Sequence, residues 1–406
     1  MMSVPRAVIT GYGCLTPLGD TAPETWDGMV AGRNAITPIP PSELGEVSIK
    51  RAGQVQRDLS EMFEPRLMRQ YDRFSLLAIG AAREALDHSG LEITEELAPR
   101  ASAVIGVGNC GWEATEEGYV RSLVERKRRS RIFDVPRVMP SAPACHVSMQ
   151  LGLKGPSFGV TSACSSSNHA FSSGLQLLRS GEAEVVVAGG AEAPIMFGIL
   201  RAWEALRIVA PERCSPFDLN RRGLMLGEGS GAVVLETLEH ARARGATIYA
   251  EFAGAGASAD AGNLVIPTPE GPERALRNCL ANARLNPEDV DYLNAHGTGT
   301  KANDVIESTV IRRVFGEHAD RLSISSTKSM HGHALGGAGA IEMIACLGAL
   351  QDNLIPPTIN YETPDPECNL DVTPNQSRER EVGAVLSNAF AFGGLNCVVA
   401  LKKFVD

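Results

Sequence analysis

Short apolar runs with glycine at or near one end recur along the chain and predict buried strands. They cover residues 6–13, 101–108, 184–193 and 231–236. Residues 71–91 instead place apolar side chains at the three- and four-residue spacing of a helix, with an alanine-rich face suited to close packing. Strands that alternate with helices in this way are typical of an α/β fold.

The strand pattern starts again after Ala246. Residues 247–257 repeat the opening order of an apolar run followed by glycines, and residues 289–296 occupy a place like that of 184–193. A chain of 406 residues is long for a single core. We therefore expect two related halves, residues 1–245 and 246–406. No low-complexity linker separates them, so we expect them to share one interface.

The composition narrows the class of protein. It is 44% hydrophobic and 21% charged with 41 glycines, which indicates a globular enzyme and excludes a fibrous or disordered chain. The net charge of −10 argues against nonspecific nucleic-acid binding, so an acidic partner would need a local basic patch.

The nine cysteines are scattered, with no CxxC pair and no Cys/His spacing typical of zinc, so we expect no metal. No signal-peptide pattern opens the chain, and no uncharged apolar run approaches the roughly 20 residues of a membrane span. These features predict free thiols in a reducing cytoplasm.

One cysteine stands in an unusual context. Cys164 lies in the small-residue segment 161–169, and residues 165–178 are a plausible helix. A helix N-terminus lowers the pKa of a thiol, which predicts an activated nucleophile. An isolated cysteine is more often a buried structural thiol. The histidine motifs downstream favour catalysis here.

Those histidines stand in two small-residue motifs, residues 294–300 and 326–333. His296 follows an apolar strand and precedes two threonines. His333 precedes a small-residue helix start, whose dipole would keep the imidazole neutral, and His331 is the competing candidate. Lys328 has Glu307 as a possible partner. One thiol and two imidazoles suit thioester chemistry with a carbanion, as in an acyltransferase that forms carbon–carbon bonds.

Residues 387–394 near the C-terminus read as a turn with two aromatic residues, Phe390 and Phe392, among small ones. Such a turn could place a backbone N–H beside the sulfur as an oxyanion donor. The alternative is an ordinary glycine turn with core phenylalanines.

The motifs together resemble those of the β-ketoacyl-acyl-carrier-protein synthases of the class I/II, or Cys-His-His, type in the thiolase superfamily. The matching segments are 162–166, 294–300 and 327–333, and residues 217–231 are similar to a further family signature. In this alignment the second histidine is His333 and not His331. The resemblance runs from about residue 6 to the C-terminus. It implies an α/β, thiolase-like duplicated five-layer αβαβα fold that is usually dimeric.

The resemblance also implies roles for the residues that match. Cys164 would take an acyl chain from an acyl carrier protein, and malonyl on a second carrier would lose CO2 and attack it. Further roles concern the enolate, the oxyanion, the gate and the substrate. The implied residues are His296 and His333 for the enolate, Lys328 and Glu307 for its support, the backbone N–H groups of Cys164 and Phe392 for the oxyanion, Phe392 with Phe390 for the gate, Thr298 and Thr300 for the pantetheine amides, and Asn109 and Trp112 for the acyl pocket.

No metal or organic cofactor enters this implied chemistry, because the substrates are held on the phosphopantetheine of the carrier. The basic segment 121–131, with Arg128 and Arg129, and the pair Arg66 and Arg69 resemble docking positions for that acidic carrier. A solvated helix face is an equally good explanation of these charges. The family forms homodimers, or heterodimers with a chain-length-factor-like subunit.

Some positions depart from the family pattern. Ala391 replaces a common glycine, which predicts a stiffer gate because alanine resists positive φ. Val265 and Ile266 stand where hydroxyl side chains commonly meet the phosphopantetheine. The motif combination is similar to that of specialised ketosynthases of the nodulation-factor and polyene type.

Three other classes of protein fit the sequence less well. A thiolase acting on CoA esters would need a second cysteine near the C-terminus, and Cys397 lies in an apolar strand. A noncatalytic chain-length-factor-like subunit would lack the nucleophile that is present here. A cysteine hydrolase would need one histidine with an orienting carboxylate or amide, and not two histidine motifs with a lysine.

Overall fold

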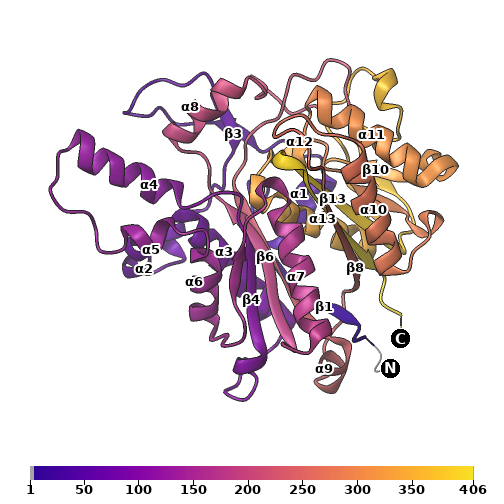
Figure 1. Ribbon diagram of the computed structural model, residues 1–406, viewed down its shortest axis with the longest axis horizontal. Coiled ribbons are helices and arrows are strands. Elements are labelled where there is room, and N and C mark those ends of the chain that lie inside the picture. The colour runs from indigo at the N-terminus through magenta and orange to yellow at the C-terminus, as the bar shows by residue number, and fades with distance from the viewer. Residues whose placement is uncertain (1–3, 406) are drawn as a thin grey trace.

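The computed structural model describes residues 4–405, whose main sheet has ten strands (Figure 1). In the N-terminal half these are β1 (Ala7–Leu15), β4 (Ala101–Gly106), β5 (Phe158–Val160), β6 (Val185–Glu192) and β7 (Gly229–Thr237). In the C-terminal half they are β8 (Ala250–Ala259), β9 (Tyr292–Asn294), β10 (Ser323–Ser325), β13 (Ala384–Ala391) and β14 (Leu395–Lys402).

The two halves use the same strand topology. Outward from the centre, the order is β1-β7-β6-β4-β5 in one half and β8-β14-β13-β9-β10 in the other. In each half the two outermost pairs are parallel and the two inner pairs antiparallel. The halves join where β1 and β8 run antiparallel, from Ala7 opposite Phe252 to Ile9 opposite Ala250. This duplication agrees with two related halves, while their boundary near residue 245 stays a prediction.

Helices on both faces complete five layers. Helices α3 (Arg73–Ser89) and α6 (Ala142–Leu151) cover one face of the first half, and α10 (Glu270–Ala283) and α11 (Lys301–Phe315) cover the outer face of the second. Helices α7 (Ser166–Ser180) and α13 (Ala338–Asp352) lie between and contact strands of both halves (Figure 1). The expected αβαβα arrangement is therefore confirmed.

Alternation along β6 shows why the strand reads as a continuous apolar run. Val185 and Val187 pack with α3 in one core, whereas Val186 and Ala188 pack with α7 in the next. Successive side chains of a strand point to opposite faces, so a strand covered on both faces needs apolar residues throughout.

The remaining elements surround these layers. They are helices α1 (Ala22–Val30), α2 (Pro65–Gln70), α4 (Trp112–Tyr119), α5 (Asp134–Val138), α8 (Phe197–Leu206), α9 (Leu238–Ala243) and α12 (Lys328–His331), and strands β2 (Ile36–Pro38), β3 (Arg51–Gly53), β11 (Leu354–Ile355) and β12 (Arg378–Glu379). Within residues 4–405, no helix combines the length and apolar character needed to cross a bilayer.

All the strand and helix segments predicted from the apolar pattern are present, apart from differences of a few residues at their ends. The turn predicted at 387–394 is wrong in its first part. Residues 387–391 end β13 and pair with β14, where Ala389 lies opposite Cys397 and Ala391 opposite Leu395. Only the last three residues, Phe392–Gly394, form a turn. The small residues of this strand are needed because all its side chains are buried between layers.

Candidate active site

Cys164 lies at the start of the central helix layer. It sits in a short 3-10 turn, Ala163–Ser165, directly before α7, and its side chain is buried. Ala163 has a φ of 50°, a left-handed conformation that L-residues adopt only where surrounding contacts impose it. This turn presents the sulfur to a cavity of about 230 Å³.

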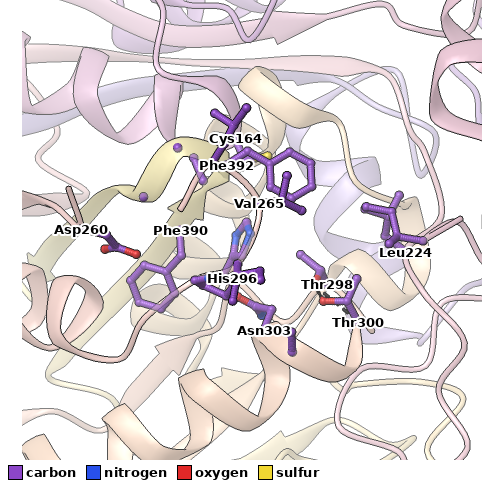
Figure 2. A pocket seen from close by; sticks show the side chains of 18 of the residues that line it. Cys164, Leu224, Asp260, Val265, His296, Thr298, Thr300, Asn303, Phe390 and Phe392 are labelled. Atoms are coloured by element: carbon purple, nitrogen blue, oxygen red, sulfur yellow. Dashed lines mark hydrogen bonds between the residues drawn. The ribbon is translucent and has the colours of Figure 1, made fainter. Parts of the chain in front are cut away.

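Residues from both halves of the chain line that cavity (Figure 2). Cys164 comes from the first half, and His296, His333 and Phe392 come from loops that follow β9, α12 and β13. Phe390, Thr298 and Thr300 also line it. The structure thus brings together seven residues to which the sequence resemblance gave a role, from segments more than 200 positions apart.

Burial, and not the helix dipole, has the largest effect on the pKa of the Cys164 thiol. It raises the pKa of Cys164 to about 11, whereas the sequence context predicted a lowered value. That prediction is wrong because desolvation of the thiolate outweighs the favourable local groups. Lys328 lowers the pKa, Glu192 raises it, and the backbone N–H groups of Phe392 and Cys164 lower it by hydrogen bonding to the sulfur.

Those two backbone N–H groups are the pair that the sequence resemblance implied for an oxyanion. Because both reach the sulfur, they also lie near the position that a thioester oxygen on Cys164 would take. The indole of Trp203, in α8, stacks on Phe392 with ring centroids 6.2 Å apart and planes at 24°. Nothing in the sequence pattern marked Trp203 as a neighbour of this turn.

The two imidazoles meet edge to face. The ring centroids of His296 and His333 are 5.4 Å apart, with the planes at 84°. Burial holds the pKa of each well below its usual range, and the charge of Lys328 lowers both further. Both rings are therefore neutral near pH 7. Among residues 4–405, Nδ1 of His296 and both ring nitrogens of His333 have no hydrogen-bond partner, which leaves them available to a bound substrate.

The structure separates His333 from its competitor. His331 is fully buried, does not line the cavity, and hydrogen-bonds through Nε2 to the hydroxyl of Thr327 at 3.1 Å. The backbone of His333 donates to the carbonyl of Met225 at 2.7 Å and accepts from Gly227 at 3.0 Å. The segment 217–231, noted in the sequence as a signature, therefore holds this histidine in place.

The predicted pairing of Lys328 with Glu307 is wrong. Lys328 forms a fully buried ion pair with Glu342 of α13. Glu307 instead accepts hydrogen bonds from the backbone N–H groups of His296, at 2.8 Å, and Gly297, at 2.7 Å, and from the amide of Asn388, at 3.0 Å. These donors satisfy its carboxylate, and burial raises its pKa.

The sequence held a signal for Glu342 that was missed. It is the only charged residue among positions 338–351, in a helix of alanine, glycine and large apolar side chains. A lone carboxylate in such a helix indicates a buried, paired charge. Glu192, another fully buried acid near Cys164, was also missed, although it is the only charged residue of its strand.

The mouth of the cavity combines polar and apolar groups. Thr298 and Thr300 lie side by side in Figure 2, with their hydroxyl oxygens 2.9 Å apart. Leu264, Val265 and Ile266 also line the cavity and are exposed. The carbonyl of Leu264 accepts a hydrogen bond from Gly393 at 2.8 Å, which ties this rim to the turn after β13.

Ala391 does not strain that turn. Its φ is −109°, an extended conformation that suits alanine, and the positive φ values of 78° and 68° fall on Gly393 and Gly394. The stiffening predicted from a left-handed Ala391 is therefore wrong.

Other predicted residues lie away from the cavity lining. Asn109 and Trp112 do not line it, although the Asn109 side chain lies near Glu192. All four candidate docking arginines are exposed, and none forms an ion pair with a described residue. They are Arg66 and Arg69 in α2 and Arg128 and Arg129 in the loop before α5. The roles predicted for these residues stay predictions.

Comparison with known proteins identifies the family. Residues 5–241 match the model described as "Beta-ketoacyl synthase, N-terminal domain" and residues 249–362 the corresponding C-terminal domain. The chain is 55% identical over 398 residues to Nodulation protein E of Rhizobium sp. (strain N33), covering 98% of this chain and 99% of that one. It is 40% identical over 410 residues to 3-oxoacyl-[acyl-carrier-protein] synthase 2 of Coxiella burnetii, covering 99% of each.

A solved structure described as the ishigamide ketosynthase/chain length factor superposes with a TM-score of 0.93 at 33% identity, covering 99% of this chain and 100% of that one. The chain therefore belongs to the β-ketoacyl synthase family of acyltransferases and has its thiolase-like fold.

Proposed function

We propose that the protein condenses an acyl group held on Cys164 with malonyl-acyl carrier protein, with loss of CO2, to give a β-ketoacyl carrier two carbons longer. One observation carries the proposal. A thiol, two neutral imidazoles with unpartnered nitrogens and two backbone N–H groups aimed at the sulfur share one cavity. Each group matches one step of the reaction.

In the first step the sulfur of Cys164 attacks the carbonyl of an acyl thioester. The new C–S bond forms as the bond to the carrier sulfur breaks, and the carrier thiol leaves with the proton. The N–H groups of Cys164 and Phe392 stabilise the negative charge on the carbonyl oxygen. A thiol with a pKa of about 11 is almost fully protonated at pH 7, so a neutral imidazole nearby must accept its proton.

In the second step malonyl on a carrier loses CO2, and the electron pair of the broken C–C bond becomes an enolate. His296 and His333 donate N–H hydrogen bonds to the enolate oxygen. The enolate carbon then attacks the Cys164 thioester, a C–C bond forms, the C–S bond breaks, and the thiolate takes up a proton. Neutral imidazoles suit this role. The N–H of a neutral ring is a much weaker acid than that of an imidazolium, so it can stabilise an enolate without protonating it.

The proposed chemistry uses no metal or organic cofactor, since the phosphopantetheine belongs to the carrier substrate. Thr298 and Thr300, at the mouth, are the groups we assign to its amides. We assign carrier docking to Arg66, Arg69, Arg128 and Arg129, whose exposed charges suit an acidic protein.

We further propose that the protein acts as a homodimer or with a chain-length-factor-like subunit. Strand β5 ends the sheet, and the segment that follows α4 projects from the body (left in Figure 1). That segment exposes Leu123, Ile132 and Val135, each by more than two thirds. An open sheet edge and exposed apolar side chains are each suited to contact with a second subunit. The name of the ketosynthase/chain length factor relative supports a heterodimer as one form.

We place the protein in a specialised branch and not in primary fatty-acid elongation. The support is its 55% identity to a nodulation protein, against 40% to a 3-oxoacyl-[acyl-carrier-protein] synthase 2. A thiolase is disfavoured, because Cys397 is buried in β14 and does not line the cavity.

The test is elongation of a panel of acyl carrier thioesters by malonyl carrier, with products identified by mass spectrometry. Wild type and Cys145→Ala, which changes an exposed cysteine, should elongate, and Cys164→Ala should not. Elongation by Cys164→Ala, or release of free acid in place of a β-ketoacyl product, would overturn the proposal.

A further inference from the structure

A buried carboxyl next to the cavity has no part in the chemistry above. Glu192 ends β6 and is fully buried. Its Oε2 accepts hydrogen bonds from the backbone N–H of Gly108, at 2.6 Å, and of Gly336, at 3.0 Å. Its Oε1 makes no hydrogen bond of normal geometry to a residue within 4–405, although Asn109 lies near enough to lower the pKa of the carboxyl.

The two amides belong to loops from different halves of the chain. Gly108 follows β4 and begins the loop that contains Asn109, whereas Gly336 lies three residues after His333. A Cβ on Gly336 would lie 1.9 Å from the backbone nitrogen of Gly108, so the two backbones are in direct contact. Glu192 bridges them with a single oxygen.

The same junction contacts the nucleophile helix. Ser167, three residues after Cys164, donates a hydrogen bond from its hydroxyl to the carbonyl of Gly336. Leu335, immediately before Gly336, has a φ of 45°. This left-handed conformation is unfavourable for leucine and persists only where neighbouring contacts impose it. Glu192 and Ser167 supply those contacts on the two polar groups of Gly336.

The carboxyl also acts on Cys164 through its charge. Burial, with a smaller contribution from the charge of Asp72, raises the pKa of Glu192 to about 7 against the lowering effect of its hydrogen-bond donors. Glu192 is therefore ionised in the alkaline range where the thiol titrates. Besides burial, the charged groups that set the pKa of Cys164 are Lys328, which lowers it, and Glu192, which raises it.

We propose that Glu192 is a positioning residue for the condensation, holding the loop after His333 and the loop at Gly108 against the nucleophile helix. This role rests on the proposed function. Without the carboxyl, two buried N–H groups lose their acceptor and the Leu335 turn can relax, which moves His333 relative to Cys164.

The test compares Glu192→Ala and Glu192→Gln with a matched control, Glu84→Gln. Glu84 also accepts two backbone N–H groups, from Cys14 and Ala22, but lies on α3 in an outer layer. Circular dichroism first shows that each variant is folded. The rates of acyl loading and of condensation are then measured separately. The rate of alkylation of the Cys164 peptide by iodoacetamide is followed from about pH 8 to about pH 10 by mass spectrometry.

Glutamine keeps an oxygen that can accept both N–H groups, so Glu192→Gln should condense within about threefold of wild type. Its loss of charge should speed alkylation of Cys164 at about pH 8, by about threefold. Glu192→Ala should condense at least about tenfold more slowly but lose much less in loading, since His296 keeps its place to accept the thiol proton. Glu84→Gln should match wild type in all three rates.

A folded Glu192→Ala variant that condenses at the wild-type rate would overturn the positioning role, and an unchanged alkylation profile in Glu192→Gln would overturn the charge effect. Where the alanine variant does not fold, Ser167→Ala removes the other contact to Gly336, and unimpaired condensation by it would equally count against the junction. If wild type condenses no carrier thioester, the proposed function fails, whereas the alkylation comparison still decides the charge effect.

Discussion

Replacement of Glu307 tests how the loop of His296 is held. The carboxylate is fully buried and accepts hydrogen bonds from the N–H groups of His296 and Gly297 and from the amide of Asn388. Glu307→Ala leaves three buried donors without an acceptor. At about 1–3 kcal/mol for each unsatisfied group, the cost is roughly 3–9 kcal/mol. Because a whole domain is stable by about 5–15 kcal/mol, this variant should fold poorly.

Glu307→Gln is the more informative change. Whichever way the amide lies, one oxygen remains an acceptor and the NH2 group faces a donor, so we expect a loss of about 1–3 kcal/mol. A shift of His296 by even 1 Å should slow condensation by about a hundredfold, because the imidazole no longer meets the enolate oxygen. Loading of Cys164 should fall much less, since the N–H pair at the sulfur and His333, which can accept the thiol proton, keep their places.

The assay combines urea unfolding with separate measurement of loading and condensation. Glu317→Gln changes an exposed glutamate just after α11, the helix that carries Glu307. It is the control and should behave as wild type. A Glu307→Gln variant that keeps both its stability and its condensation rate would show that the carboxylate does not hold this loop. Equal losses in loading and condensation would also contradict this role, because they would show a general defect.

Three further changes test other parts of the structure. Lys328→Met leaves Glu342 as an unpaired buried charge and should lower the free energy of unfolding, measured in urea, by about 3–5 kcal/mol. A smaller loss in this variant than in the Lys328→Met, Glu342→Leu double variant would contradict this. Burial lowers the pKa of His146 to about 4, below its unfolded value near 6.5. As the pH is lowered, the unfolded chain therefore binds the proton before the folded chain does. The free energy of unfolding falls by about 1.4 kcal/mol per pH unit between about pH 6.5 and about pH 4. His146→Phe should flatten this fall in urea unfolding, and an unchanged slope would count against it. Gly227→Ala would place a Cβ 2.6 Å from a backbone carbonyl and should lower the condensation rate, whereas Gly118→Ala, with open space around it, should not; equal rates would disprove the close approach.

The side chains that do chemistry could be predicted from the sequence because their types and neighbours identify them. Cys164, His296 and His333 each stand in a small-residue motif, and the structure brings all three to one cavity. The strands could be predicted as well, since a strand covered on both faces must be apolar along its length.

The features that could not be predicted from the sequence depend on packing between segments far apart in the chain. The partner of Lys328 depends on how α12 meets α13, and because Glu342 lies outside the histidine motifs, the sequence pointed to Glu307 instead. The thiol pKa depends on burial by layers from both halves, which a local helix dipole does not report. Residues 387–391 read as a turn because their composition is small and polar, yet pairing with β14 makes them a strand.

Carbon–carbon bond formation should consume an acyl group held on Cys164. The most direct measurement isolates the acyl-enzyme, confirms one acyl group on the Cys164 peptide, and adds malonyl carrier labelled with ¹³C in its free carboxyl. The proposal predicts that the acyl-enzyme mass disappears at the rate at which unlabelled β-ketoacyl carrier appears, and that all the label leaves as CO2. Product that forms while the acyl-enzyme persists, or label retained in the product, would contradict it.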